Sequence, residues 1–185
     1  LSASEERIDY CDSIAEEYAG WSSNVTLPKF DTSLGTLREV DLSCEMNLSQ
    51  EVMIENENPN PTNYTLILAG ELTVGLPSSD GLSISFNQST AGNLSGYDGN
   101  TDYAGSSGTK SVIQIPTEAA AKSIADISDF LANAPGESKV LPVVVDAISQ
   151  TKTSGRSNSG VFSIAGAEVC VSYTYDPKSE EGGQN

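Results

Sequence analysis

The stretch Val40-Asp-Leu-Ser-Cys-Glu-Met-Asn-Leu48 decides the fold class of this chain. Apolar and polar residues alternate along it without a break, and Val52 and Ile54 extend the same alternation. Because successive side chains of a β-strand point to opposite faces, this pattern predicts a strand with one buried face and one wet face.

Similar alternation recurs along most of the chain and is separated by turn-rich segments. The further predicted strands are Tyr64–Leu76, Leu82–Phe86, Ser111–Pro116, Lys139–Ser149, Val161–Ile164 and Val169–Tyr175. Residues 87–108 are dense in Gly, Asn, Ser and Asp and are predicted to be a loop. Many short strands with turns between them predict a mainly β protein, an antiparallel two-sheet β-sandwich of the jelly-roll or immunoglobulin-like kind.

Two segments change to a helical period. Residues 1–20 open with a capping-box spacing at Ser2 and Glu5 and then carry apolar residues three and four apart. Residues 117–131 show the same spacing and predict one inserted helix. The expected organisation is therefore an N-terminal helical arm over 1–26, a sandwich over 27–176 and a disordered tail over 177–185.

Charge and missing residue types exclude several function classes. The chain has 26 acidic and 9 basic residues, a net charge of −17, and no histidine. A polyanion repels phosphate backbones and anionic lipid, so no nucleic acid and no membrane insertion are expected. Without histidine, a CxxC pair or a GxSxG or SxxK motif, the sequence predicts no catalytic residues and no enzyme. The acidity fits either a solubility device or a salty medium.

Three cysteines allow three pairings. The alternation places Cys44 on the apolar face of its strand, while Cys170 lies on the wet face of another. A bridge needs facing Cβ vectors, which disfavours a bond between Cys44 and Cys170. We therefore predict a disulfide between Cys11 and Cys170, within the chain or across a subunit boundary, and a buried thiol at Cys44.

Several features point to an extracellular location. Five Asn-x-Ser/Thr sequons are possible N-glycosylation sites, at Asn24, Asn47, Asn63, Asn87 and Asn93. The sequence begins with Leu1, which favours a secreted chain from which a signal peptide has been removed. A secreted glycoprotein with a disulfide is the expectation.

One short segment places oxygen-bearing side chains at alternate positions. Asp98, Asn100 and Asp102 have the spacing that begins a calcium-binding loop, so they are a possible metal site. The rest of the calcium template fails, because Tyr103 stands where glycine is required and Thr109 stands where glutamate is required. A turn-rich loop is favoured over a calcium site, and no cofactor is expected.

Three segments together resemble one family of secreted surface proteins. Leu27–Leu37 (LPKFDTSLGTL), Tyr97–Gly108 (YDGNTDYAGSSG) and Phe162–Tyr175 (FSIAGAEVCVSYTY) are similar to the ordered motifs of the choice-of-anchor E domain. The resemblance covers about residues 27–176. It implies an all-β extracellular domain held to an envelope by a variable anchor, with no catalytic residues. The helical arm, the cysteines and the lack of a visible C-terminal anchor depart from the family pattern.

These departures shape the predicted function. A surface domain without an anchor is either freely secreted or held by its neighbours. The chain is therefore expected to be an acidic structural protein of the cell surface that self-assembles through sheet edges, the N-terminal arm and disulfides. The product would be a homopolymer such as an archaeal tubular sheath, a surface filament or an S-layer-like envelope. The alternative is a monomeric secreted adhesin or carbohydrate-binding module.

Overall fold

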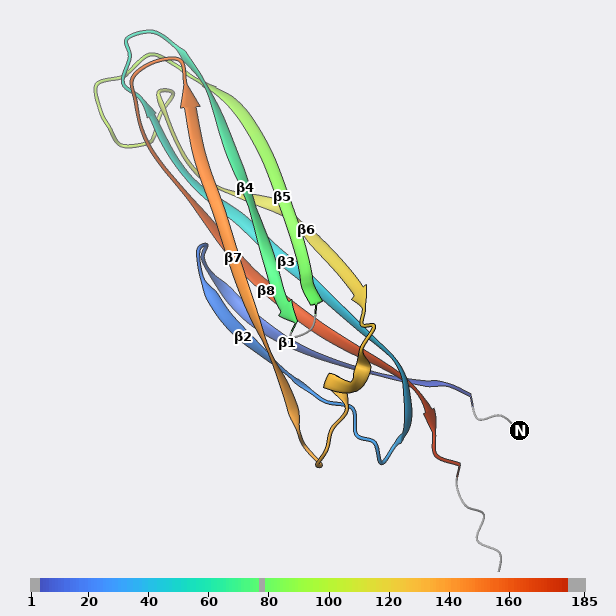
Figure 1. The fold of residues 1–185 in the computed structure, drawn as a ribbon. Coiled ribbons are helices and arrows are strands. Elements are labelled where there is room, and N and C mark those ends of the chain that lie inside the picture. Colours follow the sequence, from blue (N-terminus) through green and yellow to red (C-terminus); the bar gives the residue numbers. More distant parts are fainter. Residues whose placement is uncertain (1–3, 77–78, 180–185) are drawn as a thin grey trace, which may run out of the picture.

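The computed structural model describes residues 4–76 and 79–179, which form two stacked antiparallel sheets (Figure 1). The strands, with one short 3-10 helix, are β1 (Glu6–Tyr18), β2 (Ser22–Pro28), β3 (Gly35–Asn56), β4 (Thr62–Leu76), β5 (Ser79–Leu94), β6 (Gly108–Ser123), η1 (Ile127–Phe130), β7 (Ser138–Thr153) and β8 (Ser157–Pro177). The predicted mainly β sandwich is confirmed.

The strand order distinguishes the two kinds of sandwich that the sequence allowed. One sheet has the order β1-β8-β3-β6 and the other has the order β2-β7-β4-β5. All of these pairs are antiparallel, and this order of eight strands is that of the two Greek keys of a jelly roll. The edge strands are β1 and β6 in the first sheet and β2 and β5 in the second.

The core lies between the sheets and is built from the alternating apolar residues. Val40, Leu42 and Met46 of β3 are fully buried, as the pattern of that strand predicts. Tyr173 of β8 is also fully buried, and its hydroxyl donates to the Pro28 carbonyl over 2.7 Å. Since a buried phenol needs a hydrogen-bond partner, this contact fixes β8 against the end of β2.

The predicted N-terminal helix is wrong. Residues 6–18 form β1, which pairs with β8 along most of its length, and residues 22–28 form β2 in the opposite sheet. Ile8, Tyr10 and Ile14 are half-buried on one face, so a period of two underlies the same apolar residues that suggested a helix. A short helix is marginal in water without tertiary packing, whereas β1 gains a ladder with β8 and packs Ile8, Tyr10 and Ile14 against the core.

The predicted inserted helix is also wrong. Residues 108–123 form β6, and only Ile127–Phe130 make a short 3-10 turn, for which the Asp126 side chain accepts the Ser128 N–H. A register shift opposite Met46 and Leu48 of β3 interrupts β6. Because a bulge moves the following side chains to the other face, it conceals the period of two in the sequence.

Several strands are longer than the sequence suggested. β5 continues to Leu94, well into the predicted loop, and the two predicted strands at the end of the chain are one strand, β8. In the predicted tail, Pro177 belongs to β8 and the Lys178 N–H donates to the Leu34 carbonyl. Residues 180–185 of that tail lie outside the described residues.

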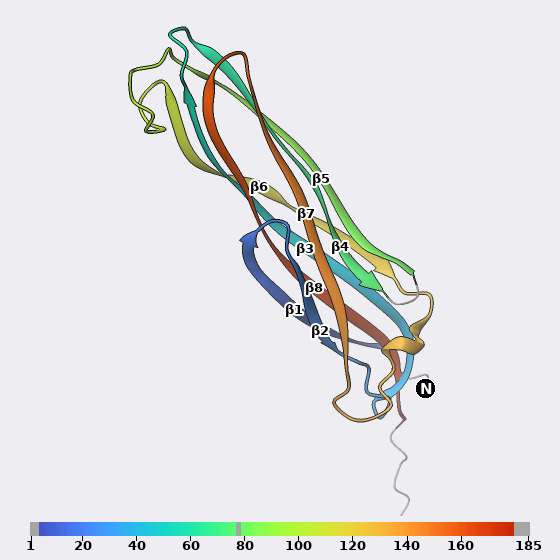
Figure 2. The same cartoon turned by 60° about the vertical axis from the view of Figure 1, so that its left-hand side comes forward.

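The sandwich is elongated, with its chain connections gathered at two ends (Figures 1 and 2). The β3–β4, β5–β6 and β7–β8 connections meet at one end, where the Tyr97 N–H donates to the Asn58 carbonyl. The turn between β1 and β2 lies about midway along the molecule instead. Within the described residues, no helix has the length and apolar character needed to cross a bilayer.

Candidate functional site: sheet edges and associated groups

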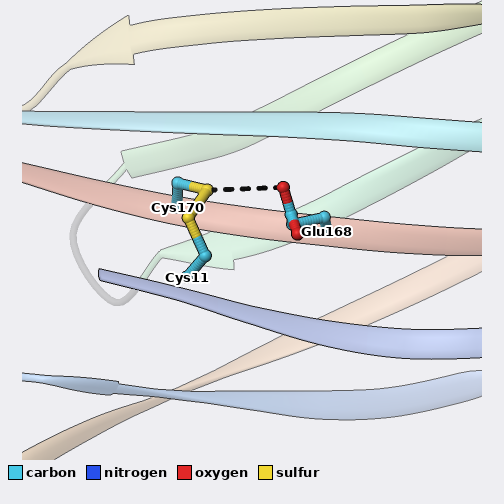
Figure 3. Close-up of side chains that lie close together, drawn as sticks. All are labelled: Cys11, Glu168 and Cys170. Atoms are coloured by element: carbon cyan, nitrogen blue, oxygen red, sulfur yellow. Dashed lines mark hydrogen bonds between the residues drawn. A yellow bond between two sulfur atoms is a disulfide. The ribbon is translucent and has the colours of Figure 1, made fainter. Parts of the chain in front are cut away.

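The disulfide joins the two cysteines that the sequence paired. Cys11 of β1 and Cys170 of β8 are directly opposed in the antiparallel register and are bonded within the chain (Figure 3). Glu168 lies close to both sulfurs, and these three residues are the one group of possible metal ligands found in the described part of the chain. Because both sulfurs are in the disulfide, they offer no thiolate to a metal.

Cys44 is buried on the core face of β3, as predicted. Burial, with a smaller contribution from the negative charge of Glu45, raises the pKa of its thiol to about 11. Since the thiolate is the reactive form, this cysteine is inert at neutral pH and acts as a core residue.

The possible metal residues Asp98, Asn100 and Asp102 lie in the loop between β5 and β6. The Asp98 side chain accepts the Asn100 N–H over 2.9 Å, and the Asp102 side chain accepts the Ala104 N–H over 3.0 Å. Both contacts are turns in which Asp bonds the backbone two residues on. Neither aspartate belongs to a group of three possible ligand residues with atoms within 4.8 Å in the described structure.

Glu55 is a buried carboxylate that the sequence reasoning missed. It is fully buried at the end of β3, and its Oε2 accepts the N–H of Tyr103 over 2.8 Å. Tyr103 has a positive φ of 56°, a conformation that costs energy for a residue with a side chain. Glu55 therefore anchors the loop at its least favourable backbone position. The signal in the sequence was an acid at the end of a strand, just before a turn rich in Asn and Pro.

All five sequon asparagines are exposed on strands. Asn24 lies on β2, Asn47 on β3, Asn63 on β4, and Asn87 and Asn93 on β5. Each side chain therefore points to the outer face of a sheet, where a glycan would meet solvent.

The four sheet edges differ in how they are protected from pairing with another chain. Charges, prolines and short length are the usual protection. β1 carries six charged residues, and β6 carries Lys110, Glu118 and Lys122 as well as Pro116. β2 has seven residues, ends at Pro28, and its Thr26 N–H donates to the Asp12 side chain of β1. β5 has sixteen residues and no charge or proline from Gly81 to Leu94.

A further edge is open along part of β7 and β8. β1 pairs with β8 only as far as Ile164, and β2 pairs with β7 only as far as Val144, with backbone bonds from Val145 to residues 20 and 21. β7 and β8 continue well beyond the turn between β1 and β2 in both views of the fold (Figures 1 and 2). The Ala19 N–H also donates to the Ser163 carbonyl, so the segments 147–153 and 157–162 have a backbone neighbour on one side only.

The composition of this open edge is unusual for the chain. Residues 147–167 contain no acidic residue, although the whole chain has 26, and they include Lys152 and Arg156. Ile148 is 63% exposed on the outer face of β7. The least acidic stretch of the protein therefore coincides with strand edges that lack a partner.

An exposed aromatic pair lies where β1 ends. Tyr18 is 62% exposed and Phe162 is 46% exposed, with ring centroids 6.0 Å apart. The two rings border a hollow of about 240 Å³ that Ala147, Ser149 and Ser163 also line. The Tyr18 hydroxyl donates to Glu51, and the charge of Glu51 raises the pKa of Tyr18.

Comparisons with known proteins give no family for this chain. No family model matches it, and no curated protein matches it. Among solved structures, it is similar to a T=1 particle derived from infectious bursal virus, with 9% identity and a TM-score of 0.18 over 94% of this chain and 41% of that chain. A D431N mutant VP2 protein of infectious bursal disease virus is 8% identical, with a TM-score of 0.15 over 94% of this chain. The chain spans less than half the length of these viral proteins, and the likeness is too weak to assign a family.

Proposed function

We propose that this chain is a structural protein of the cell surface that self-assembles through its sheet edges into an extracellular sheath, filament or envelope layer. The open edge of β7 and β8 supports this proposal most directly. Unpaired backbone N–H and C=O groups on an edge pair readily with a strand of another molecule. This edge is long, lacks acidic residues and carries the exposed Ile148 beside it.

The proposal differs from the sequence-based expectation in the contacts that join the copies, because the N-terminal arm and the disulfide are no longer among them. β1 pairs with β8 of its own chain, and the Cys11–Cys170 bond lies within the chain. The assembly proposed here therefore uses sheet edges alone, and a non-reducing gel of denatured protein should give a monomer band.

The proposal includes an extracellular location, which the disulfide and the exposed sequons support. Disulfides persist in oxidising compartments, and here the bond ties the edge strand β1 to a central strand of the same sheet. The exposed sequon asparagines fit glycosylation in such a compartment.

The assembly state of the purified mature protein tests the proposal. We expect electron microscopy of native surface material to show ordered tubes, fibres or sheets, and the purified protein to form them above a critical concentration. Protein that stays monomeric in analytical ultracentrifugation over a wide range of concentration and salt would contradict the proposal. Salt is varied because a net charge of −17 repels copies of the chain at low ionic strength.

A monomeric secreted adhesin or carbohydrate-binding module is the second candidate, and the Tyr18–Phe162 pair favours it. Exposed aromatic rings offer apolar faces for stacking, and the adjacent serines and Glu51 offer polar contacts. A glycan array followed by calorimetry should then find a ligand that the double variant Tyr18→Ala with Phe162→Ala no longer binds. Tyr97→Ala, at the far loop, is the control and should bind normally.

A further inference from the structure

We infer that assembly is head-to-tail, with β5 of one copy pairing with the open edge of β7 in the next copy. This inference rests on the proposed function and names its two surfaces. β5 is the edge strand that the usual protections leave uncovered.

β5 is exposed as an edge along most of its length. Lys122 of β6 donates to the Gly81 carbonyl at the beginning of β5. From Ser83 to Asn93, no side chain of the described residues donates to or accepts from a backbone group of β5 beyond its ladder with β4. Its outward side chains Ser83, Ser85 and Asn87 are small, polar and uncharged. Natural edges of this length normally carry a charge or a proline, and β5 carries neither within this stretch.

The distribution of charge indicates that the strand pairing with β5 belongs to a second copy of this chain. Two molecules of net charge −17 repel one another except where acidic residues are absent. Gly81–Tyr97, which contains most of β5, and residues 147–167, which contain the open edge, are the two longest acid-free stretches of the sequence. Lys152 adds one positive charge to the second stretch, which lessens the repulsion between copies there, while Arg156 is ion-paired with Glu57 of its own chain.

The open edge of β7 has backbone groups that point away from β4. Val145 exchanges backbone hydrogen bonds with Gly20 and Trp21, so its N–H and C=O face away from β4. Because this direction alternates along a strand, the backbone groups of Ala147, Ser149 and Thr151 face the same way, beyond the reach of β2. A strand of another copy can therefore hydrogen-bond to this row of unpaired backbone groups, on the same side of β7 that β2 covers further along.

Two different surfaces in contact make an open chain of copies. β5 and β7 lie on opposite sides of β4 in the order β2-β7-β4-β5. Pairing β5 with β7 of the next copy therefore continues one sheet from molecule to molecule. A heterologous contact of this kind gives filaments, whereas β5 pairing with β5 gives a closed dimer.

The experiment introduces acidic residues at each edge and compares assembly. The first variant, Ser83→Glu with Ser85→Glu, changes β5, and the second, Ile148→Glu with Gln150→Glu, changes β7. All four positions are exposed on the outer faces of their strands. We expect each variant to stay folded and to raise the critical concentration for assembly by about tenfold or more, because charged side chains on an edge strand oppose its pairing with a strand of another chain. The matched control, Val112→Glu with Gln114→Glu on the protected edge β6, should assemble as the unaltered chain does.

Mixing the two variants separates head-to-tail assembly from other geometries. The β5 variant keeps an intact β7 edge and the β7 variant keeps an intact β5 edge, so the mixture should form 1:1 dimers that grow no further. Thr151→Pro provides a second β7 variant, because it removes an N–H that faces away from the ladder with β4. Dimers of the β7 variant alone, or unchanged assembly of both variants, would overturn this inference while leaving the proposed function intact. An unaltered chain that never assembles would instead overturn the proposed function.

A further experiment tests whether sugars at Asn87 and Asn93 cover the β5 edge. Glycans are removed from the native protein, and assembly is compared before and after. Assembly only after that removal would overturn β5 as the native contact.

Discussion

Removal of the Cys11–Cys170 bond should lower the stability of the fold substantially. The two cysteines are 159 residues apart in the sequence. A cross-link that closes a loop of that length restricts the unfolded chain by about 5 kcal/mol at 25 °C, if its effect is entirely entropic. Native disulfides typically contribute about 2–4 kcal/mol, so a loss of about 2–5 kcal/mol is expected. For a domain of this size, each kcal/mol changes the melting temperature by about 2–4 °C.

The assay is urea unfolding of the double variant Cys11→Ser with Cys170→Ser, followed by the fluorescence of Trp21. This residue is the one tryptophan of the sequence, and its indole N–H donates to the Ala165 carbonyl across the sandwich. Both cysteines lie at the surface-facing side of their strands, so serine should fit without repacking the core. The unfolding midpoint should fall clearly below that of the unaltered oxidised chain.

Two controls assign the effect to the bond. A reducing agent should destabilise the unaltered chain by the same amount and should not change the double variant. Cys44→Ala should respond to the reducing agent as the unaltered chain does, because its thiol is not bonded. A loss of stability below about 1 kcal/mol would refute the view that this bond restricts the unfolded chain.

Three further predictions concern single side chains. Glu55→Ala should destabilise the fold by about 1–3 kcal/mol and speed amide exchange in residues 95–107, because the Tyr103 N–H loses its acceptor, whereas Glu55→Gln should do less. Equal exchange in both variants would count against Glu55 as the anchor. Gly70→Ala should cost about 1–3 kcal/mol in thermal unfolding, since an added Cβ would overlap the Asp146 backbone carbonyl oxygen between β4 and β7, and an unchanged melting temperature would show that the strands can separate. The pKa of Glu137 is held below its ordinary value of 4.5, first by the Lys29 ammonium and then by the Asn133 N–H. Its stabilising contribution is therefore present above pH 4.5 and lost as the pH falls through the lower folded-state pKa, so Glu137→Gln should flatten the acid side of the stability profile. If stability fell with pH equally steeply in the unaltered chain and in Glu137→Gln, the Lys29–Glu137 ion pair would not be the cause of the acid sensitivity.

The strands with regular alternation were predictable, because which of their residues are buried depends only on neighbouring positions in the sequence. In β3, β4, β7 and β8, apolar residues at every second position mark the buried face, and the structure buries them between the sheets. The accessible face of Cys170 and the buried thiol of Cys44 followed from the same alternation. The disulfide partner of Cys170 was also correct, although the helix assumed for Cys11 was not.

The errors arose where the same residues fit two periods. Ile8, Ile14 and Tyr18 have a spacing that suits a helix, yet Ile8, Tyr10 and Ile14 also alternate, and a partner strand in β8 decided between them. In β6, the register shift changes which side chains face the core, so a period of two is not visible in the sequence. Glu55 was missed because its burial depends on a loop that begins about forty residues later in the chain.

The sequence by itself determined the faces of the main strands, the acidic surface and the exclusion of histidine-based chemistry, since these depend on neighbouring residues or on composition alone. Only the tertiary structure decided that β1 is a strand, that Cys11 opposes Cys170, and which edges remain unpaired. The physical reason is that strand pairing is a contact between distant segments. A strand edge becomes open or covered only when the length and register of its neighbours are fixed in three dimensions.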